Sequence, residues 1–450
     1  MITRRGMIGG AATAMASARR LKAANAPLDI VVIGGGIAGA AAASQLSAQG
    51  HQVVMLEAKS RLGGRINTDR SFAMPIDLGA SWIHGPSQAN PLVALAAKAG
   101  LTTAVTPDDL VQVYAATGAP LPYSVVDPKE ATYDRLTNRA RSTAARTGRD
   151  MSFQQAMTAQ QGTLFNDPVM RYFGAAWTEF DTGAPLDQLS ALQGMEDEEF
   201  GGSDVIVTNG YDRLFQPLVN GYEIRMGSPV KAISQTESDI TVEYPGGTIT
   251  ADAAVLTAPL GVLKAGSIQF SPGLASTKLA AINRVGFGTV NKVVLEFTRA
   301  TWPAGMQYFG FCRAVGAAGR ACYAMNVKRL NSQANILVVI YTGSDALRLE
   351  SLSDSQATQD ALTAIRPILG ATPPALKSSR VTRWKSEPYT KGSYSFASVG
   401  TKASDFDTIA RPQGRLYFAG EHTNGTYRGT VHGAYLSGRR AADELVLALT

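Results

Sequence analysis

The fold of this 450-residue chain is decided by one stretch near its start, Asp29-Ile30-Val31-Val32-Ile33-Gly34-Gly35-Gly36-Ile37-Ala38-Gly39. Residues 28–33 form a short apolar run, rich in β-branched side chains, that predicts a buried parallel strand. The Ala-rich segment after the glycines predicts a helix to about Ala48, which Gly50 ends. A second strand is predicted over Gln52–Leu56. Together these elements make one βαβ unit.

The glycines in this stretch have the spacing Gly34-x-Gly36-x-x-Gly39 and lie between the predicted strand and helix. In a dinucleotide-binding unit the first glycine allows the tight turn, the second lets a pyrophosphate approach, and the third lets the helix pack on the strand. The helix N-terminus favours the phosphates. Glu57 follows at about the 20-residue offset of a ribose-binding acid. The motif therefore predicts dinucleotide binding, against the alternative of a glycine-rich turn in an ordinary α/β sheet.

Composition excludes several classes of protein. Apolar residues make up 45% and charged residues 17%, which indicates a globular chain of two or three domains. Two Cys cannot form a disulfide framework, and the four His show no metal-ligand spacing, so no metal site is predicted. The net charge of +6 is concentrated near the N-terminus, which argues against nucleic-acid binding. No apolar run is long enough to span a membrane.

The periodicity predicts further elements and a division of the chain. Helices dominate residues 86–200, and strands dominate 203–270, 289–297, 336–342 and 415–419. Helices are predicted over 355–369 and 429–448. We expect a discontinuous dinucleotide-binding domain, in three pieces, with an α+β substrate-binding domain inserted in two. The pieces are 27–85, 201–275 and 375–450 for the first domain and 86–200 and 276–374 for the second.

Residues 1–26 are interpreted as a targeting segment. Arg4-Arg5 precede a weakly apolar Gly/Ala-rich run, as in a twin-arginine export signal. Met7 stands where that pattern favours Phe, and Arg19-Arg20 follow the apolar run. Ala24-Asn25-Ala26 suits a signal peptidase, although Pro27 would hinder it. The prediction is export to the periplasm, and the alternative is a basic N-terminus on a cytoplasmic protein.

Two further segments indicate which dinucleotide binds. Arg61-Leu62-Gly63-Gly64-Arg65 resembles the R-x-G-G-R element of FAD-dependent oxidases, in which both arginines suit a second phosphate contact. Near the C-terminus, the strand around Tyr417 leads to Gly420-Glu421, and Gly429-Thr430-Val431 opens a helix. This arrangement suits the ribityl chain and ring of a flavin, so FAD is favoured over NAD.

The chain from Asp29 to Leu449 resembles the flavin amine oxidase family, which includes monoamine oxidases, polyamine oxidases and flavin histone demethylases. The residues that carry the resemblance are Asp77-Leu78-Gly79-Ala80-Ser81-Trp82-Ile83-His84-Gly85-Pro86, Asp197-Glu198-Glu199-Phe200-Gly201-Gly202, Gly288-Thr289-Val290-Asn291-Lys292-Val293 and Arg383-Trp384 with Gly392-Ser393-Tyr394-Ser395. The first of these is most similar to polyamine oxidases. The resemblance implies a Rossmann-type FAD-binding domain with an inserted substrate-binding domain.

The resemblance also implies roles for particular residues. Around FAD it places Glu57 at the adenosine ribose, Arg65 near the phosphates or flavin, Val230 at the adenine, Trp384 on the isoalloxazine ring, and Glu421, Thr430 and Val431 at the ribityl and pyrimidine ends. Lys292 would hold a water against flavin N5, Tyr394 would form one wall of the substrate cage, and His84 would contact substrate. The alternatives are a surface lysine, a plain core aromatic and a structural histidine.

Two departures from the family pattern matter. Ser393 stands where monoamine oxidases link FAD through Cys, so FAD is predicted to bind non-covalently. Thr430 stands where their second cage aromatic falls, which favours an open tunnel over a narrow sandwich. The acidic run Glu196–Glu199 is either a solvated face or an electrostatic guide for a polycation.

The predicted function is oxidation of an amine, preferably a polyamine, to an imine, with O₂ reduced to H₂O₂. A related L-amino acid oxidase, or a dehydrogenase that uses another acceptor, stays open. A non-catalytic scaffold of the same fold is disfavoured by Lys292 and the C-terminal motif. Cys312 and Cys322 would face each other in a symmetric hairpin centred on Ala317, within reach of a disulfide. The sequence leaves the amine and the oligomeric state open.

Overall fold

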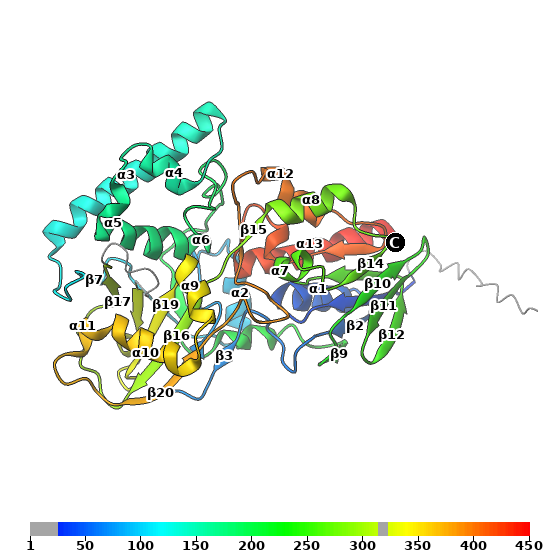
Figure 1. Cartoon of the computed structure of the whole chain (residues 1–450). Helices are drawn as coiled ribbons and strands as arrows, with labels where there is room; N and C mark the ends of the chain where they lie inside the picture. The colour runs from blue at the N-terminus through cyan, green and yellow to red at the C-terminus, as the bar shows by residue number, and fades with distance from the viewer. Residues whose placement is uncertain (1–25, 314–322) are drawn as a thin grey trace, which may run out of the picture.

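The computed structural model describes residues 26–313 and 323–450 and arranges them in two lobes that lie side by side (Figure 1). The lobe on the right of the figure contains a parallel sheet built on the N-terminal βαβ unit. The lobe on the left contains a larger mixed sheet between helices. The expected α/β fold, with a parallel sheet and a second inserted unit, is confirmed.

Five parallel strands form the first sheet, in the order β22-β13-β1-β2-β9. Their bounds are Leu416–Phe418 (β22), Ala253–Leu256 (β13), Asp29–Ile33 (β1), Gln52–Leu56 (β2) and Glu223–Arg225 (β9). Helix α1 (Ile37–Ala48) connects β1 to β2, so the predicted βαβ unit is confirmed. The carboxyl ends of β1 and β2 meet at one edge, where open parallel sheets bind their ligands.

Alternate side chains of β1 enter different cores, Ile30 and Val32 one and Val31 and Ile33 the other. The first core contains α1 and α13 (Val431–Leu449). These helices pack so closely that a Cβ on Gly438 would lie 2.1 Å from a carbonyl oxygen of α1. The second core contains the four-stranded sheet β12-β11-β10-β14, with bounds Gly247–Ala251, Ile240–Tyr244, Ala232–Gln235 and Gln269–Ser271.

The second large sheet has six strands in the order β20-β16-β19-β18-β17-β7. Their bounds are Leu376–Val381, Asn291–Phe297, Ile336–Tyr341, Tyr323–Asn326, Tyr308–Phe311 and Val111–Tyr114. Helices α3 (Tyr123–Thr147), α4 (Phe153–Thr158) and α5 (Pro168–Phe173) cover one face, and α10 (Asp354–Ala364) and α11 (Arg366–Leu369) cover the other. Burial on both faces explains the apolar run Val293–Leu295 within β16 and the continuous apolar run of β19.

Shorter elements complete the fold around these sheets. The helices are α2 (Pro91–Lys98), α6 (Phe180–Thr182), α7 (Leu260–Lys264), α8 (Ser276–Arg284), α9 (Gly343–Glu350) and α12 (Ala403–Ala410), with a π-helix, η2, over Gly174–Glu179. The strands are β3 (Thr68–Asp69), β4 (Ile76–Asp77), β5 (Trp82–Ile83), β6 (Thr103–Val105), β8 (Val205–Val207), β15 (Gly286–Phe287) and β21 (Ser395–Phe396).

The secondary structure differs from the expectation in two places. Residues 86–200, expected to be helical, also contain β6 and β7, which pair with the distant strands β8 and β17. Short strands with distant partners have little local signal. The helix expected over 355–369 is two helices, because Pro367 stands in the first turn of α11 and cannot supply the N–H that would continue α10.

Two expected domain boundaries fall inside packed units. Strand β20 lies beyond the boundary at residue 375, yet it pairs with β16 of the second sheet. Helix α8 was expected in the substrate-binding part, but Ala281 and Ile282 enter the core that contains Phe406 of α12. Strand β20 thus packs with the second sheet and helix α8 with the first lobe, and the division into domains stays a prediction.

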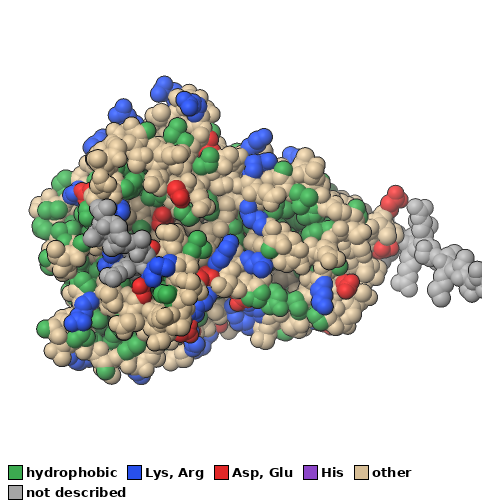
Figure 2. Space-filling model, viewed as in Figure 1, with side chains coloured by type: hydrophobic (Ala, Val, Ile, Leu, Met, Phe, Trp, Pro, Cys, Tyr) green, Lys and Arg blue, Asp and Glu red, His purple; other side chains and the backbone are tan. Residues whose placement is uncertain are grey.

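The remaining expectations concern surface charge, membrane helices, metal sites, the export signal and the disulfide. On the face in Figure 2, Lys and Arg side chains are dispersed among neutral ones. Within residues 26–313 and 323–450, no helix is long and apolar enough to cross a membrane, and no group of His, Cys, Asp and Glu is arranged to hold a metal ion. The predicted signal lies almost wholly outside the described residues, and so does Cys322 of the predicted disulfide.

Candidate active site

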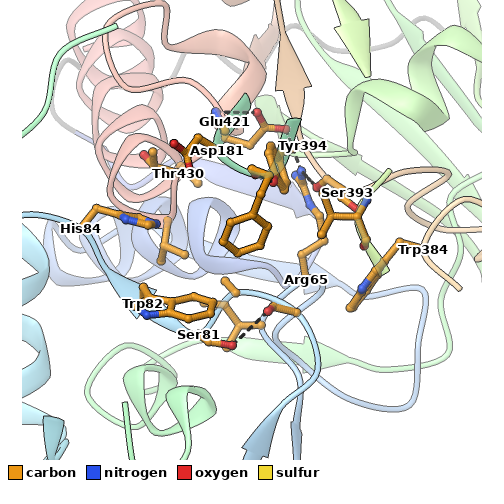
Figure 3. A pocket seen from close by; sticks show the side chains of 18 of the residues that line it. Arg65, Ser81, Trp82, His84, Asp181, Trp384, Ser393, Tyr394, Glu421 and Thr430 are labelled. Atoms are coloured by element: carbon orange, nitrogen blue, oxygen red, sulfur yellow. Dashed lines mark hydrogen bonds and ion pairs between the residues drawn. The ribbon is translucent and has the colours of Figure 1, made fainter. Parts of the chain in front are cut away.

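A continuous cavity of about 1560 Å³ is lined by residues of both lobes. This volume exceeds the roughly 300–1,000 Å³ of an ordinary small-molecule pocket. Every predicted site residue except Gly39 lines it: Gly34, Gly36, Glu57, Arg65, His84, Val230, Lys292, Trp384, Tyr394, Glu421, Thr430 and Val431. Figure 3 shows Trp82 and His84 on one side of this space and Arg65, Ser393 and Trp384 on the other.

The glycine turn after β1 forms one end of the cavity. A Cβ on Gly39 would lie 1.9 Å from the carbonyl oxygen of Gly34, so the third glycine lets α1 pack on the strand as predicted. Gly34 has φ +108°, which favours glycine. A Cβ on Gly36 would meet nothing within 4 Å. Because Gly36 begins α1 without a capping side chain, the open space at this position suits a pyrophosphate.

Glu57 ends β2 and faces the same turn. Its buried carboxylate accepts hydrogen bonds from the backbone N–H groups of Gly35, at 2.6 Å, and Lys59, at 2.7 Å. Burial raises the pKa of Glu57, and the two N–H groups oppose that shift. The carboxylate therefore ties the strand end to the glycine turn at the place where the ribose was expected.

The two arginines of the Arg61–Arg65 segment have different positions. Arg61 donates to the carbonyl oxygens of Leu62 and Gly64, both at 2.9 Å, and of Ile66 at 3.2 Å. Arg61 thus holds the loop in shape and is not among the cavity-lining residues, contrary to the expectation that both arginines contact a phosphate. Arg65 lines the cavity.

Glu421 joins three segments through its buried carboxylate. Arg65 donates to Glu421 Oε1 and to the Ser393 carbonyl oxygen, both at 2.7 Å. Glu421 Oε2 accepts from the N–H of Gly429 at 3.0 Å and from the hydroxyl and N–H of Ser395 at 2.5 and 3.2 Å. Burial raises the pKa of Glu421, but Arg65, His422 and the hydrogen bond from Ser395 together shift it downward. Glu421 therefore acts as an organiser of the loops at the expected ribityl end.

Thr430 caps the N-terminus of α13. Its hydroxyl accepts from the N–H of Gly433 at 2.9 Å and donates to the carbonyl oxygen of Tyr427 at 2.8 Å. Both hydrogen-bonding functions of the hydroxyl are thus occupied, which leaves Thr430 as a small side chain in the cavity wall beside Val431. The N-termini of α1 and α13, each with its positive dipole end, both contribute to this wall.

Trp384 and Ser393 lie where the flavin ring was expected. Trp384 is buried, and a Cβ on Gly79 would come within 3.1 Å of its ring, so the indole packs against backbone. The Ser393 hydroxyl donates to the carbonyl oxygen of Val290 at 3.0 Å and accepts from its N–H at 2.9 Å. Val230 lines the cavity beside Glu57, at the expected adenine end.

Lys292 of β16 is buried, which excludes the alternative of a surface lysine. Its Nζ donates to the carbonyl oxygens of Asp77 and Gly79, at 3.0 and 2.7 Å, and to Ser81 Oγ at 2.7 Å. Burial lowers the pKa of Lys292 to about 8, and the Asp77 carboxylate opposes the shift. Burial also raises the pKa of Asp77 to about 6. Lys292 fixes segment 77–81 against the cavity wall, close to Trp82.

Tyr394 presents its ring, rather than its hydroxyl, to the cavity. The hydroxyl donates to the carbonyl oxygen of Phe180. Glycines flank the ring, because a Cβ would lie 2.5 Å from it on Gly183 and 3.3 Å from it on Gly429. Burial raises the pKa of the Tyr394 hydroxyl, which keeps it protonated. The position agrees with one wall of an aromatic cage.

His84 and two carboxylates form a charged group at the other end of the cavity. His84 Nδ1 lies 2.5 Å from Asp204 Oδ2, and 51% of the His84 side chain is exposed. Burial lowers the pKa of His84, but the hydrogen bond to Asp204 and the charges of Asp204, Asp181 and Glu199 together shift it upward. Burial raises the pKa of Asp181 to about 7, although His84 opposes this. Asp181 lies near Thr430 in Figure 3.

The segment Glu196–Phe200, here called the acidic lip, borders the same end. Asp197, Glu198 and Glu199 are exposed and line the cavity, whereas Glu196 does not line it and pairs with Arg141 at 3.3 Å. The run is therefore more than a solvated face, and three of its four carboxylates belong to the cavity.

Sequence reasoning missed several lining residues. They are the carboxylates Asp108, Asp181 and Asp204 and the aromatic residues Tyr172, Trp177, Phe180, Tyr308 and Tyr323. None belongs to a motif used above, and Asp204 is 120 positions from His84, its partner.

The residues present fit a flavin dinucleotide. A Cβ would fill the space at Gly36, two helix N-termini supply N–H groups for phosphates, and Trp384 provides a flat buried wall. A bound flavin supplies the electron sink for oxidation of a C–N bond. The chain contributes the aromatic walls that orient an amine and exclude water, and the carboxylates that attract a cation.

Comparison with known proteins identifies the class. A family model described as flavin containing amine oxidoreductase matches residues 37–446, and the chain belongs to this family. Polyamine oxidase 4 of Oryza sativa subsp. japonica is 34% identical over 441 residues, which cover 93% of this chain and 88% of that protein. Polyamine oxidase 2 of Arabidopsis thaliana is 33% identical over 437 residues, with 92% and 87% covered.

Two further similarities agree with this assignment. Lysine-specific histone demethylase 1B of Mus musculus is 30% identical over 472 residues, which cover 99% of this chain and 56% of that protein. A solved structure of putrescine oxidase with putrescine bound shares the fold, with a TM-score of 0.76 at 20% identity over 94% of this chain and 99% of that one. The family resemblance seen in the motifs is confirmed, and the protein is a flavin-dependent amine oxidoreductase.

Proposed function

We propose that this amine oxidoreductase acts on polyamines, with non-covalently bound FAD and with O₂ as the electron acceptor. The observation that carries the proposal is the acidic lining of the cavity end that contains His84: Asp108, Asp181, Asp197, Glu198, Glu199 and Asp204. Carboxylates in a cleft attract a substrate with several positive charges and raise its local concentration. The names of the two plant relatives agree with this substrate class.

The proposed reaction transfers two electrons and two protons from the amine to O₂. The amine loses two electrons and two protons and becomes an imine, which water hydrolyses to an aldehyde and a shorter amine. O₂ takes up two electrons and two protons and becomes H₂O₂. The chain binds the amine between Tyr394 and the opposite wall, keeps water out, and holds segment 77–81 through Lys292.

The arginines of the cavity argue against an amino acid substrate. Among the described lining residues, Arg65 is held by Glu421, Arg141 by Glu196 and Arg428 by Asp197. A substrate carboxylate would have to compete with these acids. Peroxide release measured with spermine, spermidine, benzylamine, tyramine and L-amino acids tests the proposal. We expect the largest kcat/KM with the polyamines, and a tenfold preference for any other class would contradict it.

Non-covalent binding is supported by Ser393, whose hydroxyl is bonded to both backbone groups of Val290. Acid precipitation should leave a colourless protein pellet and a yellow supernatant. A flavin peptide that survives protease digestion would contradict this part of the proposal.

We also propose export through a twin-arginine signal, on the basis of Arg4-Arg5 and the weakly apolar run that follows. Changing Arg4 and Arg5 to lysine should retain the protein in the cytoplasm, as measured by cell fractionation. In the exported protein, Cys312 and Cys322 would be able to form a disulfide. Mass spectrometry without reduction that finds two free thiols would exclude the bond.

A further inference from the structure

Arg428 contacts the acidic lip from beneath. Its guanidinium is nearly buried, with 7% of the side chain exposed. Nη2 donates to Asp197 Oδ1 at 3.0 Å and to the carbonyl oxygens of Gln193 and Gly194, both at 3.1 Å. Nη1 donates to the carbonyl oxygen of Gly425 at 3.3 Å. One side chain therefore joins the segment that leads into the lip to the turn that precedes α13.

The same turn makes two more contacts with the lip. The N–H of Glu198 donates to the carbonyl oxygen of Thr426 at 2.9 Å. The ring of Phe200 stacks on Tyr427, with centroids 4.8 Å apart, and both rings meet His432 edge-on at 5.2 and 5.1 Å. Three successive residues of the turn, 426 to 428, thus hold three residues of the lip.

The turn also reaches the cofactor end of the cavity. Gly429, next to Arg428, donates its N–H to Glu421, and Thr430 caps α13. The spatial relation between the lip and the expected flavin site is therefore set over a few residues of hydrogen-bonded backbone.

The ion pair leaves the remaining charges of the lip available. Arg428 neutralises Asp197, whereas Glu198 and Glu199 are exposed and line the cavity. We propose that Arg428 is a positioning residue for substrate recognition, which holds the acidic lip so that Glu198 and Glu199 face the cavity at a fixed distance from the flavin. The inference rests on the proposed function, because it requires a substrate with more than one positive charge.

The test compares Arg428→Met and Arg428→Lys with wild type and with Arg284→Met. Arg284 is a matched control, because it forms an ion pair with Asp405 through bonds of 2.9 and 2.5 Å. Arg284 does not line the cavity. The first readout is limited proteolysis by a glutamate-specific protease, with cleavage at Glu196, Glu198 and Glu199 located by mass spectrometry. The second is KM and kcat with spermine and with hexylamine.

We expect the lip of Arg428→Met to be cleaved at least about tenfold faster than that of wild type or of Arg284→Met. The ratio of kcat/KM for spermine to that for hexylamine should fall about tenfold, mainly through KM for spermine. Arg428→Lys, which keeps the charge, should recover part of both effects. Cleavage equal to that of Arg284→Met, or an unchanged ratio, would overturn the inference.

A second variant and a comparison of substrates separate the possible outcomes. If Arg428→Met does not fold, Asp197→Asn removes the ion pair alone and should loosen the lip in the same direction, and an unchanged lip would then overturn the inference. If the lip loosens but wild type shows no preference for spermine, the proposed polyamine function fails, while the anchoring of the lip by Arg428 stands on the cleavage data.

Discussion

The two ends of the cavity are built differently. At the cofactor end, glycine turns and helix N-termini provide N–H groups, and the charges of Arg65 and Glu421 neutralise each other inside the protein. At the substrate end, aromatic rings alternate with carboxylates, and Glu198 and Glu199 are exposed to the cavity. One end is shaped mainly by backbone, and the other is shaped by side chains and carries several carboxylates.

This difference separates two tasks. A cofactor that stays bound requires a site of fixed shape, and close backbone contacts provide it because only glycine fits them. A substrate that enters and leaves requires attraction without tight enclosure, which charges at an open wall supply. Changes at the first end should therefore affect cofactor retention, and changes at the second should affect KM.

The largest effect is expected at the glycine turn. In Gly39→Ala the new Cβ would lie 1.9 Å from a carbonyl oxygen, so α1 must shift, at a cost of about 1–3 kcal/mol or more. The purified variant should contain little flavin. Gly36→Ala should keep the circular dichroism of wild type, since its Cβ meets nothing within 4 Å, yet bind flavin weakly.

The flavin-to-protein absorbance ratio measures both variants, with Gly162→Ala as a control at a glycine that is equally open. A Gly39→Ala protein that retains wild-type flavin would show that the turn does not form the cofactor site.

Lys292→Met should slow turnover about a hundredfold while flavin stays bound, because it removes the buried ammonium that holds segment 77–81 beside the expected flavin ring. Rapid-mixing measurements of both half-reactions provide the test. Lys278→Met is the matched control, because Lys278 Nζ also donates to three carbonyl oxygens, which lie in α12 and just after it. Lys278 does not line the cavity.

The control should lower the free energy of unfolding by about 1–3 kcal/mol, since buried acceptors lose their donor, and leave the kinetics unchanged. Equal kinetics in Lys292→Met and Lys278→Met would show that Lys292 is structural.

Replacing Glu198 and Glu199 with Gln should raise KM for spermine about three- to tenfold and flatten its dependence on salt, because exposed charges attract over distances that salt screens. Glu243→Gln, at an exposed acid on β11, is the control. If the double variant keeps the salt dependence of wild type, the acidic lip does not guide the substrate.

The smallest effect is expected in the pH dependence of KM. The pKa of Asp181 is about 7, and the pKa of His84 is raised by Asp204 after burial lowers it. As the pH rises through about 7, Asp181 gains its negative charge, so KM for spermine should fall. Asp108, Glu199 and Asp204 also face Asp181, and their negative charges oppose its ionisation.

Asp181→Asn should reduce this change of KM about two- to threefold, as measured by steady-state kinetics across that pH range. A KM that is constant or rises with pH in wild type would contradict the expected direction.

The cofactor end could be predicted from the sequence because its determinants are local. The strand, glycines and helix of residues 29–48 are contiguous, and the structure places them nearly as expected. The spacing of the motif could not show that its two arginines have different roles. Arg61 donates hydrogen bonds to carbonyl oxygens of its own loop, whereas Arg65 lines the cavity. Nor did local spacing show that the Thr430 hydroxyl caps α13.

The substrate end could be predicted only in part. His84 was found through a motif, but Asp204 and Asp181 reach it from segments about 100 positions away, brought there by strand β8 and by the helices over residues 168–182. Such contacts depend on tertiary packing, which has no periodic signature along the chain.

The most direct test of the whole account is the anaerobic mixing of the purified enzyme with a polyamine, with bleaching of the flavin absorbance followed in time. We expect complete bleaching by spermine, about tenfold faster at equal low concentration than by benzylamine. Faster bleaching by benzylamine, or none by any amine, would contradict the assignment of the negative end of the cavity to polyamine recognition.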